Sequence, residues 1–314
     1  MLELIVAPYD AASPEAVRNR DSLKSLEEYA RSRLHQLRLP SEVDPRFAKL
    51  MQALADIPYA APVDQQDLLR RYPELRGHVG LLEACLEQYP EILTGKIDPI
   101  FVIFPGCTFQ LLEPVYRDNP IAAHYNKVVA EVVDRFVRLR PGRNTRILEV
   151  GAGTGGTTQY VLPVLSDADV EYVFTDVSAA FFKNARQRFS DYKFVKYQVH
   201  NVEAKPEFGQ TFDIVIAANV IHATSDIGNS LRNIRSALSD DGILILREVT
   251  SRNDFATLTF GLLDGWWRHS DGHRIPNSPL LTGQAWRSFI QAAGFSDLAS
   301  RGDEDHQVIV AEAG

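Results

Sequence analysis

The stretch 146-RILEVGAGTGGTT-158 decides the fold of this 314-residue chain. Its apolar residues Ile147, Leu148 and Val150 predict a buried parallel strand, and the glycines that follow let the backbone turn sharply where that strand ends. We expect a helix to begin at about Thr157. A helix N-terminus and bare backbone amides would then face any polar ligand that lies across the strand tip.

Two classes of ligand use such a turn, and Glu149 separates them. The glycine spacing fits the Gly-x-Gly-x-x-Gly pattern of dinucleotide-binding folds, so the glycines alone leave the ligand open. A dinucleotide-binding strand normally has an apolar residue two places before the first glycine. A carboxylate is costly to bury there unless it orients the loop or meets the cationic amino-acid end of S-adenosylmethionine. The residues expected to bind this methyl donor are therefore Glu149, Gly151, Gly153 and Gly155.

The composition excludes several classes of protein. No apolar run approaches the roughly 20 residues that span a bilayer, and no secretion signal opens the chain, so we expect a soluble cytoplasmic protein without a membrane partner. The formal charge of −8 disfavours nucleic acid as a partner. No metal-ligand spacing is present, and no metal is expected. The abrupt start of the chain suggests a piece of a larger protein.

Strand and helix patterns alternate from Arg146 onward. This alternation predicts an α/β fold with a doubly wound, Rossmann-like parallel sheet. Two short strands near the end of the chain are separated by only a few residues, which suits an antiparallel pair. A seven-stranded sheet with one antiparallel strand is typical of methyltransferases. The expected strands are 146–150, 171–176, 193–199, 212–218, 242–247, 296–300 and 307–311, and the expected helices are 157–165, 179–189, 226–238 and 283–293.

The chain divides into two predicted parts. Residues 1–119 are expected to form a mostly helical cap or substrate subdomain, and residues 120–314 the methyltransferase core with a lid insertion at 251–281. Ser22 is expected to cap the first amphipathic helix. Further predicted segments are helices over 45–57, 80–93 and 121–139, and a short strand-like run in 97–119 that joins the two parts.

Polar residues follow the second and third predicted strands, where a nucleoside would lie. Asp176 is about 20 residues beyond the glycines, a position at which a carboxylate accepts both ribose hydroxyls. Its alternative role is to cap the following helix, which Ser178 could also do. Asn201 is chemically suited to bind adenine, since an amide both donates and accepts. Surface polarity explains Asn201 and Glu203 equally well.

His222 and Glu248 follow the fourth and fifth predicted strands. Neighbouring strand tips would bring them together beside the glycine loop. A carboxylate on one imidazole nitrogen fixes the tautomer and makes the other nitrogen a better base. A structural histidine and a surface glutamate are the alternative, but the pair at the ligand edge favours catalysis. In the lid, Trp266 and Trp267 could wall an acyl tunnel or simply pack the lid down.

Together these motifs resemble the C-methyltransferase domain of modular polyketide synthases. The resemblance covers about residues 100–295 and depends on the combination rather than on any single motif. One departure is visible: the family usually has Leu-Asp-Ile-Glu where this chain has 200-HNVE-203. Asparagine still accepts from adenine, so cofactor binding is expected to survive. The matching motifs are ILEVGAGTGGTT, YVFTDVS, DIVIAANVIHAT, LREVT, and FGLLDGWW with R-x-P after it.

The resemblance implies methylation of the α-carbon of a β-ketoacyl chain that phosphopantetheine tethers to an acyl carrier protein, among neighbouring polyketide synthase domains. His222, held by Glu248, would remove the α-proton and form an enolate. Tyr125, Asn219 and Trp266 are candidates to contact the substrate, Asn219 also the cofactor, and ordinary packing explains Tyr125 equally well. Three rivals stay open: a small-molecule O-methyltransferase, a dinucleotide oxidoreductase, which Glu149 disfavours, and a non-catalytic methyltransferase-like scaffold.

Overall fold

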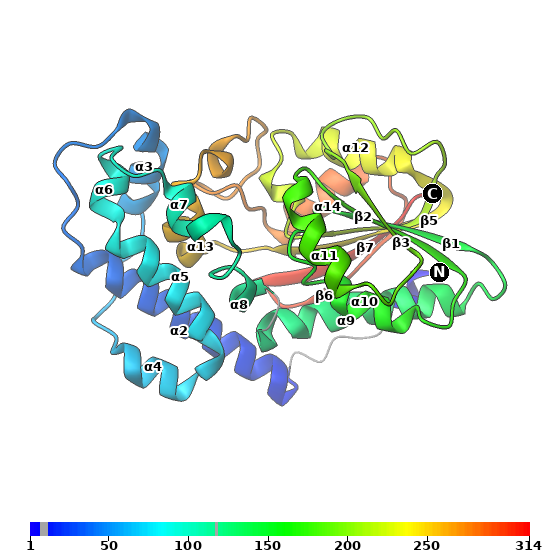
Figure 1. The fold of residues 1–314 in the computed structure, drawn as a ribbon, viewed down its shortest axis with the longest axis horizontal. Coiled ribbons are helices and arrows are strands. Elements are labelled where there is room, and N and C mark those ends of the chain that lie inside the picture. The colour runs from blue at the N-terminus through cyan, green and yellow to red at the C-terminus, as the bar shows by residue number, and fades with distance from the viewer. Residues whose placement is uncertain (7–11, 117–118) are drawn as a thin grey trace.

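The computed structural model describes residues 1–6, 12–116 and 119–314. Within these residues the strands form one seven-stranded sheet in the order β3-β2-β1-β4-β5-β7-β6 (Figure 1). Strand β7 is antiparallel to both of its neighbours, and the other pairs are parallel. The predicted Rossmann-like methyltransferase sheet is thus confirmed. The strands are β1 Thr145–Val150, β2 Val170–Asp176, β3 Val195–Val199, β4 Phe212–Ala218, β5 Leu238–Val249, β6 Leu298–Gly302 and β7 His306–Glu312.

Helices cover both faces of the sheet, which explains the continuous apolar run of β1. Successive side chains of a strand point to opposite faces. Ile147 belongs to the apolar core beneath the helices of one face, and Leu148 to the core beneath those of the other. The first face is covered by α9 (Pro120–Arg138), α10 (Thr158–Val164) and α11 (Phe182–Arg188), and the second by α12 (Ile227–Ala237) and α14 (Gly283–Ala292) (Figure 1).

The N-terminal part is mostly helical, as predicted, but its first long helix begins earlier than Ser22. Helix α2 starts at Pro14, and the Ser13 side chain caps it by accepting from the Ala16 amide. Ser22 is buried inside α2 and donates its hydroxyl to a backbone carbonyl. The expected cap was wrong because Ser13, nine residues upstream and followed by Pro14, caps the helix instead. The helices are α1 Leu2–Ile5, α2 Pro14–Gln36, α3 Ala48–Ala55, α4 Gln65–Arg71, α5 Arg76–Glu87 and α6 Tyr89–Leu93, with 3₁₀ turns η1 Pro45–Phe47 and η2 Pro73–Leu75.

The segment that was expected to contain a strand is helical. It forms α7 (Pro99–Ile103), the 3₁₀ turn η3 (Pro105–Cys107) and α8 (Glu113–Tyr116); residues 117–118 lie outside the described part. Asp98 caps α7 by accepting from the Ile100 amide, and Pro99 occupies the first helical position. The β-branched apolar residues of this run gave the wrong expectation, because the capping signal outweighs their propensity.

The insertion at 251–281 packs against the N-terminal helices. It contains α13 (Asp254–Thr259) and the 3₁₀ turns η6 (Phe260–Leu262) and η7 (Asp264–Trp267). Phe255 and Leu258 share an apolar cluster with Leu26 and Leu82, and α13 lies between the blue helices and the sheet in Figure 1. The boundary at residue 119 stays a prediction. None of the helices in the described residues is both long and apolar enough to cross a lipid bilayer.

Candidate active site

The glycine loop after β1 needs glycine at two positions for steric reasons. Gly151 and Gly155 have φ angles of 60° and 75°, in the left-handed region that favours glycine. A Cβ on Gly151 would lie 2.6 Å from the Val220 side chain, and one on Gly155 would lie 2.8 Å from the Phe189 ring. The loop therefore packs directly against the segment that follows β4, as the sequence predicts for neighbouring strand tips.

Glu149 lies beneath this loop and is 1 % exposed. Its Oε2 accepts hydrogen bonds of 2.6 Å from both the Thr158 and the Tyr172 hydroxyls. Burial raises the pKa of this carboxyl to about 7, although the two hydrogen bonds oppose the shift. Glu149 thus holds the start of α10 against β2. It also lines a cavity of about 170 Å³ together with Gly151 and Gly153, and its contact with the methyl donor stays a prediction.

Asp176 closes the same loop from the end of β2. Its carboxylate accepts from the Gly153 amide at 3.0 Å and from the Ser178 amide at 2.9 Å. Ser178, not Asp176, caps the following 3₁₀ turn η4 (Ala179–Phe181) through the Ala180 amide. Burial raises the pKa of Asp176. Ser178 therefore has the capping role that was the alternative for Asp176. Ribose binding by Asp176 stays a prediction.

Asn201 is exposed just after β3. Its side-chain oxygen accepts from the Glu203 amide at 3.0 Å. The Glu203 carboxylate accepts from the Ser225 amide, which links this turn to the segment that follows η5 (Ile221–Ala223). Adenine binding by Asn201 stays a prediction, because its amide is now used within its own turn.

His222 and Glu248 are brought together as the sequence predicts. The His222 Nδ1 lies 2.5 Å from Glu248 Oε2, and the two side chains are 12 % and 0 % exposed. Glu248 Oε1 accepts from the Val220 and Ile221 amides at 3.1 and 3.0 Å. This buried carboxylate therefore orients both the ring and the turn that carries it. With the Nδ1 proton facing a carboxylate, the lone pair is on Nε2.

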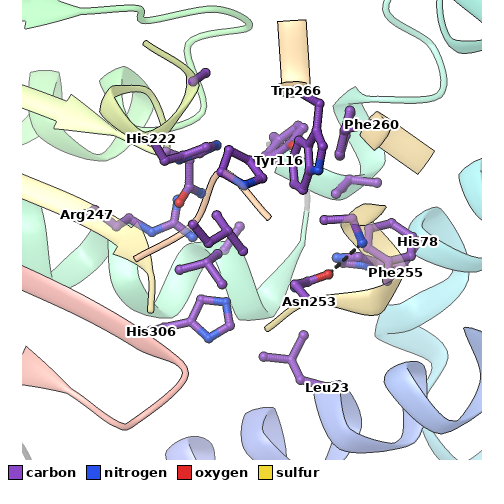
Figure 2. Close-up of a pocket in the computed structure, with 18 of the residues that line it drawn as sticks. Leu23, His78, Tyr116, His222, Arg247, Asn253, Phe255, Phe260, Trp266 and His306 are labelled. Atoms are coloured by element: carbon purple, nitrogen blue, oxygen red, sulfur yellow. Dashed lines mark hydrogen bonds between the residues drawn. The ribbon is translucent and has the colours of Figure 1, made fainter. Parts of the chain in front are cut away.

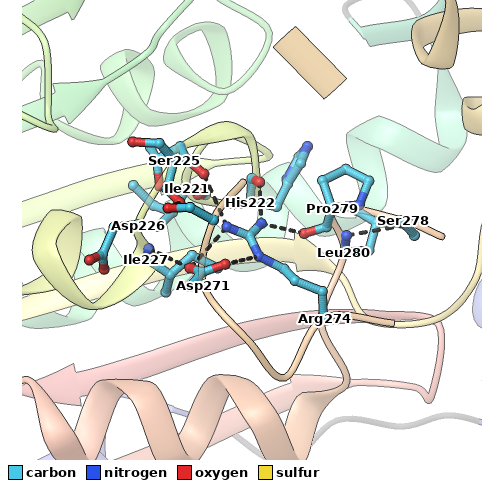
Figure 3. A network of polar contacts seen from close by, with 12 residues as sticks. Ile221, His222, Ser225, Asp226, Ile227, Asp271, Arg274, Ser278, Pro279 and Leu280 are labelled. Atoms are coloured by element: carbon cyan, nitrogen blue, oxygen red, sulfur yellow. Dashed lines mark hydrogen bonds and ion pairs between the residues drawn. The ribbon is translucent and has the colours of Figure 1, made fainter. Parts of the chain in front are cut away.

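The lid holds the same turn from outside (Figure 3). Arg274, whose side chain is 4 % exposed, pairs with Asp271 at 2.6 Å. Its guanidinium donates to the carbonyls of His222 at 2.6 Å and Thr224 at 3.0 Å, and to that of Pro279. One side chain thus connects the histidine turn with the lid segment around Pro279. Arg274 is the arginine of the R-x-P motif, whose role the sequence did not reveal.

A cavity of about 350 Å³ opens in front of His222. Its walls are largely apolar and come from the strand tips, the lid and the N-terminal helices (Figure 2). Trp266 is buried in this wall, with its ring 6.3 Å from the His222 ring in an edge-to-face arrangement, and it stacks on Phe260. Trp267 instead donates to the Gly261 carbonyl. Of the two tryptophans, Trp266 thus walls the cavity, whereas Trp267 holds the lid.

Three residues line both this cavity and the glycine-loop cavity: Tyr116, Asn219 and Arg247. Asn219 has a φ of 55°, and its backbone amide donates to the Arg247 carbonyl at 2.7 Å. Its side-chain oxygen is buried without a partner among the described residues. A buried amide oxygen facing a glycine cradle fits a donor with a cationic amino group. The residues present therefore fit S-adenosylmethionine.

Tyr125 lies behind this junction and lines neither cavity. Its hydroxyl donates to Asp303, and its ring stacks on His306 with the centroids 5.1 Å apart. Its role as a substrate contact stays a prediction. His306 and His78 do line the larger cavity, and burial lowers the pKa of each to about 4. These two histidines are 228 positions apart in the sequence, so no local pattern connects them. Only the tertiary structure brings them to one cavity.

Comparison with known proteins assigns the chain to a family. The model of a methyltransferase domain matches residues 148–244. The crystal structure of the CurJ carbon methyltransferase superposes with a TM-score of 0.83 and 32 % identity, over 99 % of this chain and 95 % of that one. The chain belongs to the carbon methyltransferase domains of polyketide synthases. Its carbon methyltransferase activity and its use of S-adenosylmethionine, both predicted from the sequence, follow from this membership.

Two further relatives agree with this assignment. The DszA carbon methyltransferase has a TM-score of 0.85 and 30 % identity over 98 % of this chain and 94 % of that one. The polyketide synthase PksR of Bacillus subtilis (strain 168) is 37 % identical over 248 residues, which are 74 % of this chain. The match spans only 10 % of PksR, so the chain corresponds to a small part of that protein.

Proposed function

We propose that this carbon methyltransferase domain methylates the α-carbon of a β-ketoacyl chain held by phosphopantetheine on an acyl carrier protein, with His222 as the base. One observation carries the proposal. The His222 ring, oriented at 2.5 Å by the buried Glu248, borders an apolar cavity that shares three wall residues with the glycine-loop cavity. The candidate base therefore lies next to a cavity for the acyl chain, and this cavity adjoins the one expected to hold the methyl donor.

The chemistry of a β-ketoacyl thioester matches this arrangement. Its α-proton is acidified by a carbonyl on each side, so a neutral imidazole is a strong enough base. Nε2 of His222 takes the proton, and the Glu248 carboxylate stabilises the resulting imidazolium. The largely apolar walls around Trp266 lower the polarity of the site, which strengthens each of these electrostatic interactions. The His222–Glu248 pair thus acts at the step that generates the carbon nucleophile.

Residues around the glycine loop would hold the methyl donor. Glu149 and the Asn219 side-chain oxygen suit its ammonium group, and Asp176 suits its ribose. Asn201 suits its adenine if the amide leaves its present contact with Glu203. Bound S-adenosylmethionine supplies an electrophilic methyl group on a positively charged sulfur. The loop and the base together bring the two reactants to one point, which provides part of the ~7–11 kcal/mol available from proximity.

A mass-spectrometric assay of acyl carrier proteins tests the proposal. The domain is incubated with S-adenosylmethionine and a carrier protein loaded with either acetoacetyl or butyryl groups. We expect the acetoacetyl species to gain one methyl group and the butyryl species to gain none, because only the first has a doubly activated α-carbon. Equal methylation of both would contradict enolate formation. Methylation of an oxygen, located by fragmentation of the product, would instead support the O-methyltransferase rival.

His222→Ala tests the base itself. We expect loss of methyl transfer with nearly unchanged affinity for S-adenosylhomocysteine in calorimetry, because His222 lines the acyl cavity and not the glycine-loop cavity. His35→Ala is the matched control, since His35 lies in the helical part, where its ring contacts the Pro58 carbonyl and the Tyr59 ring, and it lines neither cavity. Full activity of His222→Ala would remove this histidine from the mechanism. If the unaltered protein does not bind S-adenosylhomocysteine, the result would support the alternative of a non-catalytic scaffold.

A further inference from the structure

Arg247 is a buried cation that forms no ion pair with the described residues. The residue is 8 % exposed, and its Nε is buried with no hydrogen-bond acceptor in that part of the chain. Across the described residues its guanidinium has no ion pair and no hydrogen bond, and it lies over the face of the Tyr125 ring, at 5.7 Å. The Glu248 carboxylate and the His306 ring are close enough to act on its charge. Glu248, the carboxylate that acts on this charge, already accepts from the Val220 and Ile221 amides and faces His222. Such a charge is costly unless a ligand neutralises it.

The location of this cation indicates the ligand. Arg247 lines both the acyl cavity and the glycine-loop cavity, so it lies where the acceptor carbon must meet the methyl donor. Figure 2 shows its side chain beside that of His222, both facing the same space. We propose that Arg247 is a further catalytic residue that binds the two carbonyl oxygens of the β-ketoacyl thioester through its planar guanidinium and stabilises their negative charge in the enolate.

The geometry of the two partners agrees. A 1,3-dicarbonyl enolate is planar and has two oxygens on one edge, and the guanidinium offers parallel N–H donors in a planar fork. In the step, the α C–H bond breaks, its proton goes to His222 Nε2, and its electron pair is delocalised onto the oxygens that Arg247 holds. An acyl chain without the β-ketone offers one oxygen instead of two. Arg247 would therefore also favour acyl chains that still have the β-ketone over chains in which it has been reduced.

A donor carboxylate is the competing ligand for this arginine, since Arg247 also lines the glycine-loop cavity. We favour the enolate because Arg247 lines the acyl cavity beside His222, where proton removal creates a new negative charge. An enolate oxygen between the arginine and the donor sulfonium is attracted by both cations. This inference rests on the proposed function, and the experiment below distinguishes failure of the inference from failure of the proposed function.

The test follows deuterium exchange, which needs no methyl transfer. Acetoacetyl N-acetylcysteamine thioester is incubated in D₂O with S-adenosylhomocysteine and the wild-type protein, Arg247→Met, Arg247→Lys or the control Arg146→Met, and loss of the α-proton signal is followed by NMR. Arg146 on β1 pairs with Glu171 on β2, and neither residue lines either cavity. Calorimetry with S-adenosylhomocysteine and thermal melts accompany each variant.

We expect the exchange rate above background to fall about 10²–10³-fold in Arg247→Met, as it does when a hydrogen-bond donor to an oxyanion is removed. The affinity for S-adenosylhomocysteine should be retained. Arg247→Lys should recover part of the rate, and the unliganded Arg247→Met protein should melt at a higher temperature, because an unpaired buried charge is gone. Exchange at the wild-type rate in Arg247→Met, or loss of donor affinity with exchange retained, overturns the proposal. A wild-type protein that neither exchanges nor methylates overturns the proposed function as well.

Discussion

Replacing Glu248 by glutamine tests how His222 is oriented, with almost no change in shape. In the folded protein one carboxylate oxygen accepts from the Val220 and Ile221 amides, and the other lies 2.5 Å from His222 Nδ1. A glutamine keeps an oxygen for the two amides. Its NH₂ group then faces Nδ1, which must accept instead of donate, and the proton moves to Nε2. The nitrogen that faces the acyl cavity can no longer take a proton.

The expected magnitude differs sharply between two substitutions at this site. Glu248→Gln should lower kcat by roughly 10³–10⁴-fold, since the equivalent carboxylate-to-amide change in a serine protease triad costs about 10⁴-fold. Its effect on stability should be small. Glu248→Ala leaves the amides of Val220 and Ile221 buried and unsatisfied, at about 1–3 kcal/mol each, so it should also destabilise the fold.

The assay compares methyl transfer, measured by mass spectrometry of an acetoacetyl carrier protein, with urea unfolding followed by circular dichroism. Glu248→Gln should unfold near the wild-type urea concentration yet be almost inactive, and Glu248→Ala should be shifted in both. Glu207→Gln, an exposed glutamate outside both cavities, serves as the control. Wild-type kcat in a correctly folded Glu248→Gln protein would refute the role of this carboxylate in orienting the base.

Three other predictions follow from the loop and the lid. Arg274→Lys keeps the positive charge but cannot donate to three carbonyls in the same geometry. It should lower kcat more than it raises KM, and wild-type values of both would contradict a role in holding the His222 turn. Gly151→Ala should abolish S-adenosylhomocysteine binding in calorimetry, because its Cβ would lie 2.6 Å from Val220 at a φ of 60°; unchanged affinity would show that the loop relaxes freely. The pKa of Glu149, raised to about 7 by burial, means that this group's contribution to stability is highest below its unfolded value of about 4.3 and falls as the pH rises through about 7. Glu149→Gln should therefore flatten the dependence of the melting temperature on pH between these values, and an unchanged slope would contradict the shift.

Most of the fold could be predicted from local patterns. The apolar run before the glycines, the alternation that followed and the short terminal pair each depend on residues close in sequence. The errors arose where two local signals competed. Ser22 looked like a helix cap although Ser13 and Pro14 formed a better start upstream, and the apolar residues of 97–119 concealed the cap at Asp98.

By itself the sequence determined the type of sheet, the glycine loop and the pairing of His222 with Glu248, because the carboxyl ends of parallel strands lie at one edge of a sheet. Only the tertiary structure decided what surrounds that pair. Packing of the lid against N-terminal helices brought His78 and Trp266 into one cavity. Tertiary packing also buries Arg247 near Tyr116, Tyr125 and His306, which come from separate parts of the chain. Without this burial the arginine would be an ordinary solvated cation with no need of a ligand.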